Sequence, residues 1–195
     1  FRHLPFREIT EPLIVEELLQ ALGFALYRIL VPVLVTILMA ARCGAAVASD
    51  VGGKVYGQQY DALRTFGVRP DSYLLTGVFY AFILGAPLLN LLGFAVARLT
   101  SLIVFTGMRP GMGTFFWETN FSRELSVPGQ FFYAGTWWLV AKVLVCAVGT
   151  AWICYEMARR PKKSATDVSL GITSSILWST LFVLVVHFVF AFIEF

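Results

Sequence analysis

The sequence predicts an all-α integral membrane protein with about four transmembrane helices. Hydrophobic residues make up 58% of its 195 residues and charged residues only 14%, whereas soluble domains carry about 25% charged residues. The mean hydropathy of +0.76 points the same way. A soluble domain of this size needs polar groups over much of its surface, so we expect the exterior to face lipid.

The first predicted span covers about residues 24–49 and contains Arg28 and Arg42. A helix needs about 20 mostly apolar residues to cross a bilayer. Cations within such a helix face the bundle interior or extend to the membrane interface. For Arg28 both interpretations stay open: it extends to the membrane interface, or it borders a cavity that receives an anionic lipid head group.

Small residues recur at every fourth position in this span, in two neighbouring rows. Such spacing lets two helix backbones approach closely in lipid. Chance spacing in an alanine-rich helix is the alternative, but two overlapping rows favour close packing. The first row is Ala40, Gly44 and Ala48, and the second is Ala41, Ala45 and Ser49.

A polar segment, residues 57–70, follows the first span. Its apolar residues recur at helical spacing, and Gly67 and Pro70 end the predicted helix. A short helix of this kind on the membrane face can dock on a soluble partner or pack on its own bundle. The candidate docking residues are Gln58, Gln59, Tyr60, Asp61, Ala62, Leu63, Arg64 and Phe66.

The second predicted span, residues 72–97, carries no charged residue. Pro87 lies inside it and is expected to bend the helix, because proline removes a backbone hydrogen bond. The next segment, residues 112–132, is aromatic and mildly amphipathic. We expect it to form one or more short helices along the outer membrane surface.

The third predicted span covers about residues 131–155 and contains Lys142. Trp137 and Trp138 lie near its outer edge, where amphipathic rings favour the interface. The fourth span, residues 168–193, has His187 as its one titratable residue. We expect His187 to be a packing residue, because a proton relay needs several ionisable partners at membrane depth.

Lys and Arg are distributed unevenly among the loops. The loops of residues 50–71 and 157–167 are basic, whereas residues 106–130 balance two arginines with two glutamates. Because short basic loops stay in the cytoplasm, we expect both basic loops there, and the middle loop and C-terminus outside.

Several function classes lack their sequence patterns here. Residues 51–54 do not have the spacing of a nucleotide-binding P-loop, and the basic residues form no continuous face for nucleic acid. The three cysteines lack metal-site spacing, and no hydrolytic triad is supported. We therefore expect no catalytic residues, cofactor, metal or nucleic-acid partner. A secondary transporter and a non-catalytic scaffold subunit stay open as alternatives.

Residues 28–70 resemble the signature region of the MlaE/YrbE permeases, the membrane subunits of MCE-associated lipid ABC transporters. The family pattern reads approximately R-E-L-G-P, A-G-R-x-G-A-A, E-Q-I-D-A-L and G-V-D-P. This chain departs from it at Ile29, Val31, Gln58 and Arg69, which indicates a divergent member. The matching segments are RILVP at 28–32, ARCGAA at 41–46, QQYDAL at 58–63 and GVRP at 67–70; the likeness continues through 73–92 and recurs more weakly at 166–173.

The resemblance implies a permease that moves phospholipid or a related lipid between the inner membrane and the cell envelope. It implies that two copies pair, that residues 57–70 form a coupling helix docked on a cytoplasmic ABC ATPase, and that an MCE-domain protein lies on the outer face. ATP would be hydrolysed in the separate ATPase subunit. The lipid would occupy a cavity between the two copies, lined by the first span, with Arg28, Ile29 and Pro32 as candidate cavity or head-group residues.

The family also implies an interfacial helix and one more span upstream of this chain. We therefore expect residues 1–195 to be a single permease domain that is truncated at its N-terminus. Its location would be the bacterial inner membrane, with the plastid inner envelope as the alternative.

Overall fold

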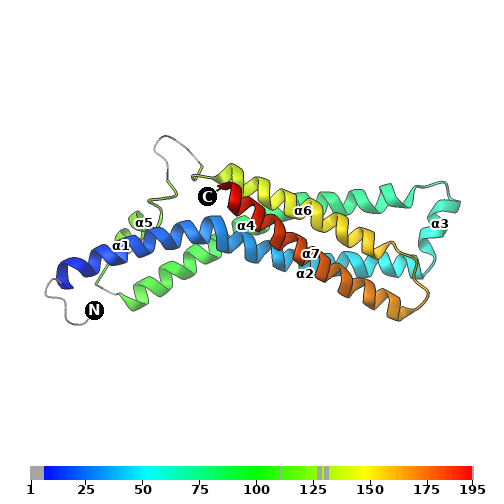
Figure 1. The fold of residues 1–195 in the computed structure, drawn as a ribbon, viewed down its shortest axis with the longest axis horizontal. Helices are drawn as coiled ribbons and strands as arrows, with labels where there is room; N and C mark the ends of the chain where they lie inside the picture. Colours follow the sequence, from blue (N-terminus) through cyan, green and yellow to red (C-terminus); the bar gives the residue numbers. More distant parts are fainter. Residues whose placement is uncertain (1–6, 110, 127–128, 130–131, 195) are drawn as a thin grey trace. The chain divides into compact units, whose positions relative to one another are not determined.

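The computed structural model describes residues 7–109, 111–126, 129 and 132–194 (Figure 1). Every regular element in these residues is helical. Four helical segments among them are long and apolar enough to cross a membrane, which confirms the predicted fold class and number of spans. These segments are Leu13–Tyr56, Pro70–Met108, Thr136–Ala158 and Ala165–Glu194.

The first spanning segment is longer than predicted at both ends. It consists of α1 (Arg7–Ala25), the π-helical turn η1 (Leu26–Leu30) and α2 (Val31–Tyr56). The prediction stopped at residue 49 because charged residues follow. Asp50 and Lys54 nevertheless continue the helix and form an ion pair of 2.6 Å one turn apart, an arrangement that supports a helix.

The π-helical turn η1 has a local cause in Pro32. Proline has no N–H to donate to the carbonyl one helical turn earlier, so the regular ladder is interrupted at Arg28. The chain widens instead, and the N–H of Val31 bonds the carbonyl of Leu26 five residues back. Such π-turns occur mostly as single turns inside α-helices, often at functional sites.

The polar connection contains the short helix α3 (Gln59–Thr65), which is shorter than the predicted 57–70. Gln58 precedes it in the left-handed conformation with φ of 59°. Next comes α4 (Pro70–Met108), 39 residues long with Pro87 inside. The predicted end of this span at residue 97 was wrong, because the helix continues through Arg98.

Three further helices complete the chain. The aromatic segment forms α5 (Thr114–Phe121), which lies inside the predicted range 112–132. The last two spans are α6 (Thr136–Ala158) and α7 (Ala165–Glu194). Asp167 accepts hydrogen bonds from the backbone N–H groups of Lys163 and Ser164 just before α7, and these bonds hold the turn that precedes this helix.

The chain divides into two compact units. The first comprises Phe1–Pro32 and Leu91–Trp137, and the second comprises Val33–Asn90 and Trp138–Phe195. In the second unit α2, α6 and α7 lie side by side (Figure 1). Their shared core contains Ala40, Cys146 and Val183, all completely buried. Small residues allow this close approach, because a side chain on Gly44 would collide with the Cys154 sulfur.

In the first unit α5 packs on α1. The Gly23 backbone of α1 faces the Phe121 carbonyl so closely that a side chain at position 23 would not fit. Phe121 stacks on Trp117 at 4.5 Å between ring centroids, and Arg123 pairs with Glu16. These contacts hold the loop after α4 against α1.

Candidate functional site

Helix α3 stands at one end of the second unit, between the end of α2 and the start of α4 (Figure 1). A helix of seven residues is unstable alone, so its position depends on tertiary contacts. Tyr60 is its one buried residue, whereas Phe66, just after the helix, is 82% exposed. Most of α3 is therefore presented outward, and Tyr60 attaches it to the bundle.

Asp71, in the first turn of α4, accepts the hydrogen bond that fixes Tyr60. The hydroxyls of Tyr60 and Tyr155 both donate hydrogen bonds to its Oδ1 atom, the second at 2.8 Å. Arg159, after α6, lies 3.7 Å from the same oxygen. One carboxylate thus joins α3, the start of α4 and the end of α6.

The environment of Tyr60 favours its neutral, hydrogen-bonded form. Burial raises the pKa of the Tyr60 hydroxyl, and its hydrogen bond to the Asp71 carboxylate raises this pKa further. The guanidinium of Arg64 lies 5.2 Å from the centre of the Tyr60 ring. Tyr60 therefore stays a hydrogen-bond donor at neutral pH.

A polar cleft of about 400 Å³ opens between α3 and the loop after α6. Its walls come from both basic loops, so residues 50–71 and 157–167 meet at the same end of this unit, as the predicted topology requires. The cleft can receive an acidic side chain or a carboxylate–arginine pair of a partner. Its charged lining residues are Asp61, Arg64, Glu156, Arg159 and Arg160.

Most of the predicted docking residues are exposed. Gln58, Gln59, Asp61, Ala62 and Arg64 are exposed and Leu63 is partly buried. Tyr60 is the exception, because its ring faces the bundle.

The predicted head-group residues lie in the first unit, on or next to the π-turn. Arg28 donates from Nε to the Ala134 carbonyl at 3.4 Å and lies over the Phe24 ring. Ile29 is exposed and Pro32 is buried. The neighbouring Tyr27 hydroxyl shares a hydrogen bond of 2.8 Å with Thr136, so the turn is held against the segment before α6.

The predicted packing and kink residues all belong to the second unit. Ala40, Gly44 and Ala48 are buried within the chain, with Gly44 facing α6 and α7. Pro87 is partly buried, next to the completely buried Ala86.

Lys142 and His187, which the sequence places inside the last two spans, have partners from other helices. Lys142 is 4% exposed and its ammonium lies 3.3 Å from the Glu194 carboxylate. His187 Nε2 and the Thr36 hydroxyl share a hydrogen bond of 2.9 Å. His187 is therefore a satisfied polar residue between helices, as predicted. Among the described residues no group of three His, Cys, Asp or Glu could hold a metal ion.

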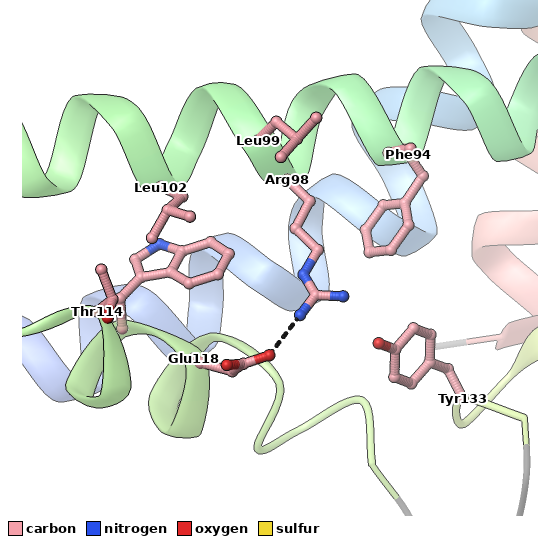
Figure 2. Close-up of a pocket in the computed structure, with 9 residues that line it drawn as sticks. Phe94, Arg98, Leu99, Leu102, Thr114, Glu118 and Tyr133 are labelled. Carbon is pink, nitrogen blue, oxygen red and sulfur yellow. Dashed lines mark hydrogen bonds and ion pairs between the residues drawn. The ribbon is translucent and has the colours of Figure 1, made fainter.

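A cavity of about 540 Å³ lies in the first unit between α4, α5 and the segment before α6 (Figure 2). Its walls are mostly apolar, but Arg98 extends into it and donates a hydrogen bond of 2.8 Å to Glu118. A second apolar cavity, of about 590 Å³, lies between α1 and α4. The aromatic and aliphatic residues lining the first cavity include Phe94, Leu99, Leu102, Trp117 and Tyr133.

Sequence reasoning missed Arg98, Asp71 and Glu194. Arg98 was placed outside the second span, although apolar residues continue at helical spacing on both sides of it. That continuation was the available signal for a charge inside a helix. For Asp71 and Glu194 the sequence carried no comparable signal, because Tyr155 and Lys142, which bond them, are 84 and 52 residues away.

The chain matches a known protein family and is similar to a plant protein. The family model described as permease MlaE matches residues 6–193. The chain is similar to protein TRIGALACTOSYLDIACYLGLYCEROL 1, chloroplastic, of Arabidopsis thaliana, with 36% identity over 83 residues. That match covers 43% of this chain and 24% of the relative.

Proposed function

The chain belongs to the MlaE permease family, and we propose that it is the membrane subunit of an ATP-driven lipid transporter. Its cargo would be phospholipid or a related lipid, moved between the inner membrane and the cell envelope. The name of the Arabidopsis relative refers to a diacylglycerol lipid, which supports a lipid cargo.

The observation that carries this proposal is the attachment of α3. A short helix between two spanning segments presents an exposed face, while Tyr60 fixes it through Asp71 to α4 and α6. A soluble partner that moves α3 would thereby move two spanning helices. The partner we propose from the family membership is a cytoplasmic ABC ATPase, which would change the permease by binding one of its states better than another.

The remaining partners follow from the family. We propose that two copies of the chain pair and that an MCE-domain protein binds the outer face. Arg28, Ile29 and Pro32 would line the lipid path, since Arg28 and Ile29 lie in the irregular π-turn of the first span and Pro32 follows it closely. The family match runs through both compact units, which supports one permease domain. The membrane would be a bacterial inner membrane or a plastid inner envelope.

Co-purification of the ATPase tests the proposal. The full-length protein is expressed with the ABC ATPase of its host, either unchanged or as Asp61→Lys/Leu63→Glu. Reversing the charge at Asp61 and placing a carboxylate at the partly buried Leu63 should abolish recovery of the ATPase. The yield of the membrane-inserted chain should not fall. Glu124→Lys, an exposed charge reversal after α5, is the matched control and should retain the ATPase.

Two outcomes would overturn the assignment. Undiminished ATPase recovery with the double variant would remove α3 as the docking helix. Lipid or solute movement by the purified chain alone, driven by a proton gradient, would instead favour the secondary transporter.

A further inference from the structure

Arg98 carries its charge inside a spanning helix. An arginine in such a helix faces the protein interior or reaches the membrane interface. Arg98 lies about 28 residues after the start of α4, which corresponds to about 42 Å along the helix axis. A bilayer with its head groups is about 40–45 Å thick. If α4 starts at one membrane surface, Arg98 therefore reaches the head-group layer of the other.

The surroundings of Arg98 form a site for a molecule with both apolar and charged parts. The cavity of about 540 Å³ falls in the usual range of ligand pockets, about 300–1,000 Å³. The Arg98 guanidinium lies 5.9 Å from the centre of the Trp117 ring. Figure 2 shows it between Glu118 on one side and Phe94 and Tyr133 on the other.

The charges of this site sum to zero. Arg98 and Glu118 are 2.8 Å apart, and their side chains are 37% and 64% exposed. In the described part of the chain, Nη2 is the one Arg98 atom that donates a hydrogen bond, so its other N–H groups can meet a phosphate. The exposed Glu118 carboxylate can at the same time meet an amine.

Phe94 and the other aromatic rings add a preference for a positively charged group. Phe94 and Tyr133 line the same cavity as the ion pair, whereas the Trp117 ring is already covered by Phe121 and by the Arg98 guanidinium. Aromatic faces attract ammonium groups, including the quaternary ammonium of choline. A lipid with a net negative head group would gain Arg98 but would face the Glu118 carboxylate without a compensating charge.

We propose that the Arg98–Glu118 cavity binds the head group of a zwitterionic phospholipid. Its phosphate would contact Arg98, and its amine would contact Glu118 and the rings of Phe94 and Tyr133. The acyl chains would follow the exposed apolar surface of α4 toward Leu92. This inference rests on the proposed lipid-transport function and specifies the lipid class.

Trp117 provides the measurement, because it lines the cavity. Brominated lipids quench tryptophan fluorescence on contact, so the quenching lost in Trp117→Phe reports lipid at this site. The full-length protein is reconstituted in nanodiscs with either brominated phosphatidylcholine or brominated phosphatidylglycerol. Wild type should show at least about fivefold stronger Trp117-dependent binding of phosphatidylcholine.

Glu118→Gln should remove or reverse this preference, because the site then carries a net positive charge. Arg98→Gln should weaken the binding of both lipids. Arg123→Gln is the matched control, since Arg123 pairs with Glu16 outside the cavity, and it should keep the wild-type preference. Protein yield and the helical circular dichroism signal verify folding. Glu118→Gln is less prone to disturb the fold than Arg98→Gln, because the Glu118 side chain is more exposed.

Equal binding of the two lipids by wild type, or an unchanged preference in Glu118→Gln, would overturn the proposal. Failure of this inference is distinguishable from failure of the proposed function. ATPase recovery with no Glu118-dependent preference would remove only the lipid assignment. The expected preference in a protein that never recovers an ATPase would remove the ATP-driven mechanism and keep the lipid site.

Discussion

The Tyr155 hydroxyl donates a hydrogen bond of 2.8 Å to the Asp71 carboxylate and thereby joins the end of α6 to the start of α4. Tyr60 donates to the same oxygen from α3. The carboxylate therefore fixes the proposed coupling helix to two spanning helices at once. A displacement of α3 reaches both helices through a single acceptor atom.

Asp71→Ala is expected to release α3 from the bundle. The substitution removes the acceptor of two tyrosine hydroxyls, and Tyr155 is only 3% exposed, so each lost hydrogen bond costs about 1–3 kcal/mol. Hydrogen exchange of the α3 amides should become about tenfold faster or more, since about 1.4 kcal/mol corresponds to tenfold. Arg159→Gln is the control, because exposed ion pairs contribute little. Unchanged exchange in Asp71→Ala would contradict the anchoring role.

Lys142→Met is expected to destabilise the protein by about 3–5 kcal/mol. The Glu194 carboxylate is 4% exposed, and the substitution removes the ammonium that faces it. Equilibrium unfolding in detergent, followed by circular dichroism, measures the effect. The double variant Lys142→Met/Glu194→Gln should recover most of the loss, because no buried charge remains. A single variant as stable as wild type would show that this ion pair is not formed in the membrane.

Gly44→Leu is expected to destabilise the second unit by about 1–3 kcal/mol or more through overpacking. A Cβ at position 44 would lie 2.7 Å from the Cys154 sulfur, well inside contact distance. Gly53→Leu in the same helix is a matched control, because nothing lies within 4 Å of a Cβ there. The thermal midpoint of the purified protein should fall for the first variant and stay nearly unchanged for the second. Equal midpoints for the two variants would contradict the close packing of α2 on α6.

Alkaline pH should weaken the attachment of α3. Burial and the Asp71 hydrogen bond raise the pKa of Tyr60 above its ordinary value of 10.0. Between pH 10.0 and the raised pKa, the unfolded state binds fewer protons than the folded state. The stability that Tyr60 contributes is therefore fully present below pH 10.0 and is lost as the pH rises through the raised pKa. In a spectrophotometric titration, Tyr60→Phe should have one tyrosine fewer than wild type among those that ionise above the ordinary pKa. Identical titration curves would contradict the shift.

The spans and the short polar helix were predictable because their signals lie in neighbouring residues. Hydropathy over about 20 residues identifies a membrane helix, and the spacing of Tyr60, Leu63 and Phe66 indicates a helix in the connection. The ends of these elements were less accurate. Asp50 and Arg98 suggested boundaries that the helices pass through, since a paired charge can be accommodated in a long helix.

The sequence by itself determined that this chain is a four-span membrane protein with a helix in a basic loop, and its local motifs indicated the permease family. Only the tertiary structure decided which polar and charged groups meet: Asp71 with Tyr155, Arg98 with Glu118, and Lys142 with Glu194. Hydrophobic patterning is a property of one helix and is visible along the chain. Hydrogen bonds and ion pairs act over a few ångströms between residues far apart in sequence, so they exist only once the helices are packed.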